Sequence, residues 1–169
     1  LSFWNSVKDI IKNTEIIAED LGEESREVDK LILDTGFPNM KVLQFAFDSD
    51  LKDRFLPRNF SRNCVCYTGT HDNDTTIGWY EKASPKERLL FERLVPKIYD
   101  SPALNLISYA MKSKARMVII PLQDYLEKPS IDRTNTPGTE KGNWEWRYSK
   151  EDLTPSLAET IIHLSKGRN

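Results

Sequence analysis

Short apolar runs alternate with segments of helical periodicity along this chain, and few folds accommodate that order. The runs with strand-like composition lie within residues 14–22, 40–48, 63–72 and 115–126. Between and around them apolar residues recur at helical spacing, as Phe3, Val7 and Ile10 do near the N-terminus. Strands that alternate with helices favour parallel βαβ units, so we expect an α/β fold.

The predicted helices have recognisable starts and stops. Ser25 is a good N-cap, and Gly36 is a C-terminal stop for the helix that follows it. Ser84, Pro85 and Glu87 form a capping box with proline at the first helical position. Similar cap-plus-proline pairs are Ser101-Pro102 and Thr154-Pro155, the latter opening a helix to about Ser165. Residues 134–144 read as an irregular loop.

A further helix contains Trp79 and begins near three residues with capping side chains. Asn73, Asp74 and Thr75 are all candidates for its N-cap, and Asp74 is the favoured one. We therefore expect the segment after the third strand to enter a helix directly.

Polar residues follow each predicted strand. These residues are Glu19, Asp20, Asp48, His71, Asp72, Asp74, Gln123 and Asp124. The carboxyl ends of parallel strands meet at one edge of a sheet or barrel, where such folds build their active sites. We therefore expect these side chains to form one polar site.

The bulk composition makes some functions improbable. A chain of 169 residues is about one domain, and 24 Lys and Arg against 26 Asp and Glu give a net charge of -2. The sequence shows no basic stripe or acidic block, so nucleic acid and membrane surfaces are poor candidates for a partner.

The sequence also bears on compartment. Its longest apolar stretch, Met117–Leu122, is far shorter than the roughly 18 residues of a membrane span. The N-terminus lacks the order of a signal peptide and starts without Met inside a predicted helix, which suggests a fragment. Cys64 and Cys66 lie two apart on one strand and so cannot readily bridge. They read as small buried hydrophobes, the alternative being part of a metal site, and a reducing cytoplasmic setting is expected.

Two of the acids suit glycosidic chemistry. A pair of carboxyl groups, one protonated and one ionised, is the usual equipment for cleaving a glycosidic bond. Glu19 follows an apolar run, which suits a general acid. The alternative is that Glu19 is an acid on a surface loop that caps the next helix. Asp72 is the second candidate, and its alternative is an Asx-turn or helix cap.

Other readings of the polar cluster remain open. His71 can donate a hydrogen bond to a bound hydroxyl or lie satisfied under its loop. It also joins Glu19, Asp72 and Asp74 in a metal-dependent hydrolase hypothesis, for which no fixed-spacing motif exists. Sugar sites need flat apolar surfaces, and the aromatic residues that could offer them are Trp79, Tyr80, Trp144 and Trp146. The alternative is that these aromatic residues pack in the core.

Four strings resemble a known family. They are "IIAEDLG" (16–22), "FPNMKVLQFAFD" (37–48), "YTGTHDNDTTIGWY" (67–80) and "NTPGTEKGNWEWR" (135–147). In order and spacing they closely resemble the C-terminal part of 4-α-glucanotransferases, also called amylomaltases, of glycoside hydrolase family 77. The resemblance covers almost the whole chain. It implies that residues 1–169 form a single partial domain, the C-terminal half (about strands five to eight) of a (β/α)8 barrel of the α-amylase clan.

The resemblance also implies roles for individual residues. Glu19 corresponds to the general acid/base of a retaining double displacement that transfers α-1,4-glucan segments. Asp72 corresponds to the carboxylate that stabilises the distorted sugar, and His71 to the histidine that binds its hydroxyls. Asn135 resembles a residue lining the substrate groove, while Phe45 or Phe47 resembles an aromatic on the acceptor side. No cofactor or metal is implied.

One part of the family's pattern is absent. Its nucleophile is an aspartate in an Arg-x-Asp context upstream of the acid/base, and no such segment precedes Glu19 here. We therefore expect the chain alone to be inactive, and its open sheet edges to pair with the N-terminal half of the enzyme or with another copy. The alternative is a non-catalytic module that binds maltooligosaccharides or serves assembly.

Overall fold

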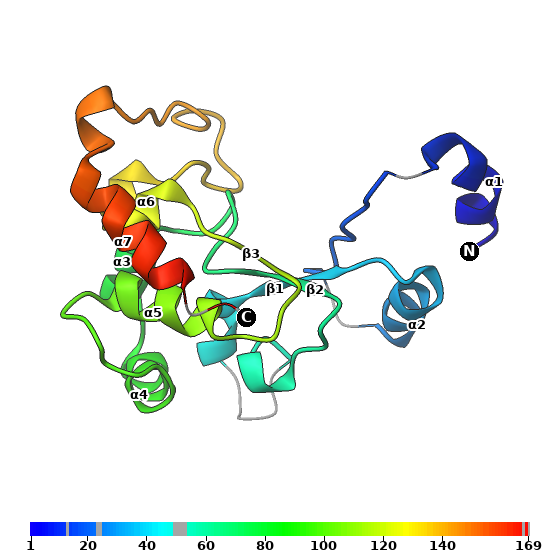
Figure 1. The fold of residues 1–169 in the computed structure, drawn as a ribbon, viewed down its shortest axis with the longest axis horizontal. Coiled ribbons are helices and arrows are strands. Elements are labelled where there is room, and N and C mark those ends of the chain that lie inside the picture. The colour runs from blue at the N-terminus through cyan, green and yellow to red at the C-terminus, as the bar shows by residue number, and fades with distance from the viewer. Residues whose placement is uncertain (13, 23–24, 49–53, 167, 169) are drawn as a thin grey trace.

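The structure of the chain is a computed structural model that describes residues 1–12, 14–22, 25–48, 54–166 and 168. Within these residues an α/β arrangement is present, as the alternating pattern predicts. A small sheet crosses the middle of the molecule, with α1 and α2 at the N-terminal end and the remaining helices on the other side (Figure 1).

Three parallel strands form the sheet of the described chain. They are β1 (Asn39–Val42), β2 (Cys64–Tyr67) and β3 (Met117–Ile119), in the order β1-β2-β3. Met40 is opposite Val65, and Val65 is opposite Met117. The register places these three residues in one row across the sheet, so their side chains share one face.

The first predicted strand, within residues 14–22, does not form as a regular strand. It meets β1 at one isolated parallel bridge between Ala18 and Asn39, where the Ala18 N–H donates to the Pro38 carbonyl at 2.9 Å. The N–H of Met40 donates instead to the Asp20 carboxylate at 3.1 Å. The Asp20 side chain thus ties the end of this segment to β1 beyond the single bridge.

The second predicted strand is shorter than expected. β1 ends at Val42, and the chain continues as the 3-10 helix Leu43–Phe47. Leu43, Ala46 and Phe47 are completely buried there. In a 3-10 helix residues three apart lie on the same side, so the run "LQFAF" satisfies a tight helical turn as well as a strand.

The helices confirm most of the predicted caps. They are α1 (Ser2–Ile11), α2 (Arg26–Thr35), α3 (Thr76–Lys82), α4 (Pro85–Leu94), α5 (Pro102–Met111), α6 (Leu122–Tyr125) and α7 (Pro155–Ser165). Ser25, Ser84, Ser101 and Thr154 each cap a helix with the side-chain oxygen. Gly36 ends α2 at φ 69°, a left-handed conformation that favours glycine.

The predicted cap of α3 is wrong. Thr75, not Asp74, is the N-cap, and its hydroxyl accepts from the Gly78 N–H at 3.0 Å. Asp74 is occupied elsewhere, because its carboxylate binds Lys82 Nζ at 2.6 Å and the Ser130 hydroxyl at 2.7 Å. α3 is thereby tied to the Ser130 turn rather than capped by the nearest acid.

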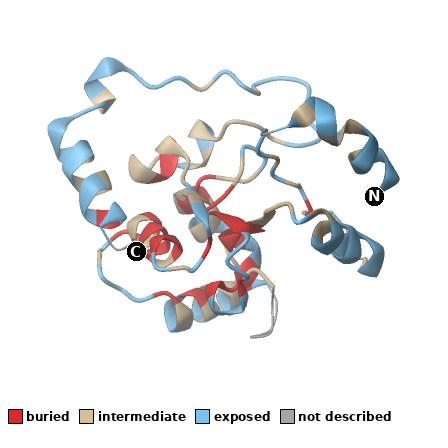
Figure 2. Cartoon of the chain, turned by 45° about the vertical axis from the view of Figure 1, so that its right-hand side comes forward, coloured by how far each residue is buried: buried red, intermediate tan, exposed pale blue. Residues whose placement is uncertain are grey.

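The two faces of the sheet have different surroundings. Cys64, Cys66 and Val118 pack against helical residues such as Phe91 and Leu106 in the main core. On the opposite face Met117 and Ile119 are 41% and 39% exposed. Buried residues accordingly concentrate around the sheet and α5, while α1, α2 and the 134–150 segment are largely exposed (Figure 2).

The two cysteines are free thiols, and both are buried on the helix-covered face. Burial raises the pKa of Cys64 to about 11 and that of Cys66 to about 12. Both therefore stay protonated at neutral pH and behave as small core residues.

No helix in the described part of the chain has the length and apolar character that crossing a bilayer requires.

Candidate active site

A pocket of about 260 Å³ lies at the carboxyl end of the strands. The residues that line it are Glu19, Leu21, Met40, Tyr67, Gly69, Thr70, His71, Asp72, Ile119 and Pro121. Three of the predicted polar residues, Glu19, His71 and Asp72, therefore meet around one cavity. They come from the segments after the first and third predicted strands, as expected for a site at this edge.

The Glu19–Asp20 pair divides into an anchor and an available acid. Asp20 is buried, and its carboxylate accepts from Asn39 Nδ2 at 2.8 Å and from the Met40 N–H. Arg54 also lies 3.6 Å from this carboxylate. Glu19 is exposed at the pocket and forms no hydrogen bond or ion pair with any residue that the structure describes. Asp20 thus holds the backbone while the Glu19 carboxyl stays available.

A tight turn presents His71 and Asp72. The Asn73 side-chain oxygen accepts from both the N–H and the hydroxyl of Thr70 at 2.8 Å, and the Asn73 N–H returns to the Thr70 carbonyl at 3.2 Å. His71 Nε2 lies 3.3 Å from Asp72 Oδ2, and both side chains are about half exposed, at 50% and 51%. The turn directs an imidazole and a carboxylate into the same space.

The loop after α6 closes over this turn. Asn135 Nδ2 donates to Asp72 Oδ1 at 2.5 Å, and Arg133 Nη2 donates to the Asp72 carbonyl at 2.7 Å. Arg133 Nε also donates to the Asn135 carbonyl at 2.7 Å. The Trp144 ring lies on His71 with centroids 4.9 Å apart. The structure therefore brings Asn135 into contact with Asp72. Such contact is required if both residues belong to one site.

Two residues of this loop were not predicted as site residues. Arg133 carries no local signal, because an isolated arginine in a polar loop is typical of surface chain. Trp144 lies in the "GNWEWR" string and was considered only as one of several aromatic surfaces. Its backbone adopts φ 63°, and its N–H donates to the Thr134 carbonyl at 2.7 Å. This bond folds the loop back on itself and fixes the ring beside His71.

Asp124, predicted at the same edge, lies beneath the site rather than in it. It is 1% exposed and accepts from the Thr68 hydroxyl at 2.5 Å, the Thr76 N–H at 2.7 Å and the Thr76 hydroxyl at 2.9 Å. Burial raises its pKa, and the three hydrogen bonds oppose that shift. Asp124 thereby joins the end of β2, the start of α3 and α6 under the His71 turn.

A second pocket of about 500 Å³ adjoins the first, and Asp72 lines both. Phe45 and Trp79 are among its residues, with Asp48 and Asp74. Phe45 is 38% exposed, so its ring is accessible there.

The prediction that either Phe45 or Phe47 contacts the substrate needs correction for Phe47. Its side chain is 0% exposed and packs against Trp79 and Phe91, with ring centroids 5.3 and 5.2 Å away. It faces the core because the chain turns into a 3-10 helix at Leu43 instead of continuing as a strand. Phe47 is thus a core residue, and Phe45 alone of the two is placed to contact a ligand.

The metal hypothesis gains no support from the geometry. Across the described ranges, no three His, Cys, Asp or Glu side chains are grouped as metal ligands would be. Asp74 in particular is held by Lys82 and Ser130.

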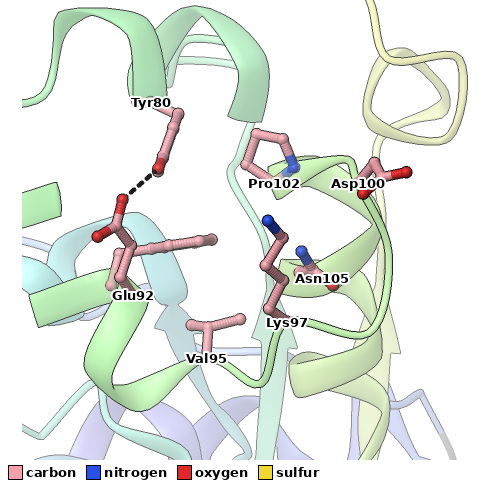
Figure 3. Close-up of a pocket in the computed structure, with 8 residues that line it drawn as sticks. Tyr80, Glu92, Val95, Lys97, Asp100, Pro102 and Asn105 are labelled. Carbon is pink, nitrogen blue, oxygen red and sulfur yellow. Dashed lines mark hydrogen bonds between the residues drawn. The ribbon is translucent and has the colours of Figure 1, made fainter. Parts of the chain in front are cut away.

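A third pocket, of about 420 Å³, lies among α3, α4 and α5, away from the strand ends (Figure 3). The Tyr80 hydroxyl donates to Glu92 there at 2.9 Å, and Lys97 points into the same space. The Tyr80 ring is covered by the Arg88 guanidinium at 5.0 Å and by Phe91 at 5.1 Å. This ring is thus part of the packing of the helices.

Comparison with known proteins adds a family to this geometry. A family profile described as 4-alpha-glucanotransferase, of glycoside hydrolase family 77, matches residues 2–154. The 4-alpha-glucanotransferase of Synechocystis is 46% identical over 156 residues, which are 91% of this chain and 31% of that protein. That of Thermus thermophilus is 39% identical over 160 residues, covering 90% and 32%.

A solved structure is similar over nearly the whole chain. The amylomaltase from Streptococcus agalactiae, determined in complex with acarbose, superposes with a TM-score of 0.90 at 31% identity. The match covers 96% of this chain and 33% of that one. This chain therefore spans about a third of the length of the relatives it matches.

Fold and site together define an α/β protein with a carboxylate-lined pocket where such folds place their active sites. The match over residues 2–154 identifies the particular group. The chain belongs to the 4-alpha-glucanotransferase family, glycoside hydrolase family 77.

Proposed function

We propose that this chain supplies the acid/base part of a 4-α-glucanotransferase that transfers α-1,4-glucan segments between maltooligosaccharides. The observation that carries the proposal is the meeting of Glu19, His71 and Asp72 around one pocket. The acarbose complex of the Streptococcus agalactiae amylomaltase supports a glucan as ligand. Because the chain spans about a third of its relatives, this activity is proposed for the complete enzyme.

Glu19 is the proposed general acid/base. In a retaining double displacement the acid protonates the leaving oxygen, then deprotonates the incoming sugar hydroxyl. That role requires a carboxyl group open to the substrate and free to change its protonation. The exposed, unbonded Glu19 side chain meets this requirement among the described residues, whereas the buried Asp20 does not.

Asp72 is proposed to stabilise the distorted sugar and its transition state through the hydroxyl groups. Its Oδ1 is held by Asn135, while Oδ2 faces His71. A carboxylate fixed from one side keeps acceptor capacity for a sugar hydroxyl on the other, and a pre-oriented acceptor costs no reorganisation during reaction. His71 and Asn135 are proposed to bind further hydroxyls, and Phe45 to offer an apolar face to the acceptor sugar.

We further propose that the chain forms about strands five to eight of a (β/α)8 barrel, with the first half as its partner. The supporting observation is the open sheet face. Met117, Ile119 and Ile17 are each exposed by about 40% on the side without helices. Neighbouring apolar side chains on an exposed sheet face favour burial against another surface. A second half-barrel, whose strands also carry inward-facing side chains, would bury them.

The nucleophile is proposed to come from that first half. A retaining mechanism requires a second carboxyl group roughly 5–5.5 Å from the acid/base. No Arg-x-Asp segment precedes Glu19 in this sequence.

The compartment is proposed to be a reducing one. Two buried free thiols suit a reducing compartment such as the cytoplasm.

A maltotriose disproportionation assay tests the proposal. Glucose and longer maltodextrins are measured for the chain alone, and for the chain mixed with the separately expressed N-terminal part of the Thermus thermophilus relative. We expect activity only in the mixture. The Glu19→Gln variant should abolish it, because glutamine cannot donate and regain a proton.

Glu159→Gln is the matched control, because it makes the same chemical change at an exposed residue of α7 that does not line the pocket. Activity of the chain alone would mean that a carboxylate within it is the nucleophile. A mixture that forms a complex and binds maltooligosaccharides without turnover would favour the alternative of a non-catalytic binding module.

A further inference from the structure

Four basic side chains gather at the edge of the sheet opposite the carboxylate pocket. Arg62, Lys114, Arg116 and Arg168 line a pocket of about 340 Å³ together with Asn63 and Ala115. No carboxylate side chain is among the described residues that line this pocket. It is therefore a concave surface of one charge sign, unlike the mixed surface that the composition predicts.

The fold places these residues from three distant parts of the sequence. Arg62 lies two residues before β2, Lys114 and Arg116 lie shortly before β3, and Arg168 follows α7. The Arg116 N–H donates to the Arg62 carbonyl at 2.8 Å, which joins the two strand entrances. Arg168 Nη2 donates to the carbonyls of Ala115 and Arg116 at 2.8 and 3.1 Å. The pocket is thus built on hydrogen-bonded backbone.

Little negative charge balances the cluster. Arg116 pairs with Glu15, but Arg62, Lys114 and Arg168 have no carboxylate within ion-pair distance among the residues described. The Nη1 of Arg168 is buried without an acceptor in that same set. Cations held close together without counter-charges repel one another and raise the local positive potential. A bound anion would lower that energy.

We propose that this pocket binds a phosphate group, either free or esterified to a sugar. Guanidinium groups offer two parallel N–H donors that match the oxygens of a phosphate, and the lysine adds a point charge. Three arginines and a lysine lining one pocket favour a compact, multiply charged oxyanion over a single carboxylate. The cavity volume exceeds that of one phosphate, which leaves room for an attached sugar ring.

The site is independent of the proposed transferase. Arg62, Lys114 and Arg116 precede strands, whereas Glu19 and Asp72 follow them. No described residue lines both pockets, so phosphate binding and glucan transfer can fail separately.

The test is a titration of the chain with inorganic phosphate at low ionic strength, followed by calorimetry and by NMR of the arginine side chains. We expect saturable binding, with shifts at Arg62, Arg116 and Arg168. The double variant Arg62→Gln/Lys114→Gln should weaken it by at least about tenfold, because it removes two charges from the pocket. Thermal unfolding and circular dichroism confirm that the variant is folded.

The matched control is Lys86→Gln/Arg93→Gln, which removes one lysine and one arginine charge from the exposed surface of α4. The proposal predicts little change for this control. It is overturned if both double variants weaken binding equally, since attraction would then follow net charge alone. Absence of saturable binding up to about 10 mM phosphate overturns it as well, because such an affinity is too weak for a specific site.

Two further ligands separate the sources of the phosphate. Glucose 1-phosphate that binds more tightly than inorganic phosphate, with no binding of glucose itself, assigns the site to a sugar ester. Equal affinities for the two phosphates assign it to the free ion. Glucose that binds as well as its phosphate would overturn the proposal, because the basic residues would then contribute nothing.

Discussion

The two edges of the small parallel sheet carry opposite chemistry. At the carboxyl edge Glu19 and Asp72 line a pocket, while at the amino edge arginines and a lysine line another. Glu19 and Asp72 follow strand segments, Arg62, Lys114 and Arg116 lie one to three residues before a strand, and Arg168 joins them from beyond α7. Because parallel strands all point the same way, a residue's place before or after a strand largely decides which edge of the sheet it joins. The two pockets thus differ in charge without any charged block in the sequence.

The two edges are also built differently. At the carboxyl edge Asp72 is held by Asn135 and Asp124 by Thr68 and Thr76, while Glu19 stays unbonded among the described residues. At the amino edge Arg116 pairs with Glu15 and Arg168 donates to backbone carbonyls, but the side chains of Arg62 and Lys114 have no bonded partner in the described structure. Substitutions at the carboxyl edge should therefore change geometry and chemistry, while those at the amino edge should change mainly the electrostatic potential.

The largest effect is expected for Asp72→Asn in the active mixture or in the full-length enzyme. Loss of the charge that we propose stabilises the transition state should lower kcat/KM roughly 100- to 1000-fold. Maltotriose disproportionation measures it, with Asp9→Asn on α1 as a control of equal charge change. A loss below threefold would show that the carboxyl edge does not depend on this charge.

The next effect concerns stability. Asp124→Ala leaves the donors of Thr68 and Thr76 without their acceptor in the core, which should lower the free energy of unfolding by about 2–4 kcal/mol. Asp124→Asn should cost much less, because its amide nitrogen can donate to the two hydroxyls while its oxygen accepts the Thr76 N–H. Denaturant unfolding of both variants measures the difference, and equal losses would contradict this account.

The difference in stability between Asp124→Asn and the native chain should depend on pH. Burial raises the pKa of Asp124 in the folded chain. Its contribution to stability is therefore greatest below the ordinary carboxyl pKa and declines as pH rises through the folded value. Asparagine does not titrate, so the stability of Asp124→Asn relative to the native chain should improve from acidic to neutral pH.

A smaller effect is expected at Arg133, a positioning residue. Arg133→Ala removes the bonds to the carbonyls of Asp72 and Asn135, which should lower kcat/KM about tenfold. Arg133→Lys should restore part of the rate, since one donor can still reach a carbonyl. Arg93→Ala on α4 controls for lost arginine. Full activity of Arg133→Ala would show that Asn135 alone holds Asp72.

The smallest effect distinguishes the amino edge. Lys114→Gln removes one of several unbalanced like charges, so the midpoint of thermal unfolding should rise by about 1 °C at low salt. The rise should vanish at high salt, where the repulsion is screened. A decrease at low salt would mean that Lys114 has a stabilising partner and that this edge is less free than its contacts indicate.

Local signals in the sequence account for much of this structure. Ser25, Ser84 and Thr154 cap their helices because capping depends on residues three apart. Glu19, His71 and Asp72 meet at one pocket because each follows an apolar run. Local signals could not decide which of Phe45 and Phe47 is exposed. It depends on a 3-10 turn whose apolar pattern also fits a strand.

Features that combine distant residues escaped prediction. Arg133 meets Asp72 across 61 positions of the chain, and Arg168 reaches the carbonyl of Ala115 across 53. No spacing rule connects such residues, because their proximity follows from packing rather than from a local period. The basic pocket is invisible in the sequence for the same reason.

The buried thiols give this chain an internal reporter of opening. With pKa values near 11 and 12, Cys64 and Cys66 hold almost no thiolate at neutral pH, and both are shielded from solvent. A thiol reagent can modify them only when the helical layer separates from the sheet. The rate of their alkylation therefore measures how often that layer lifts, and a partner that covers the other face should slow it if the two faces unfold as one unit.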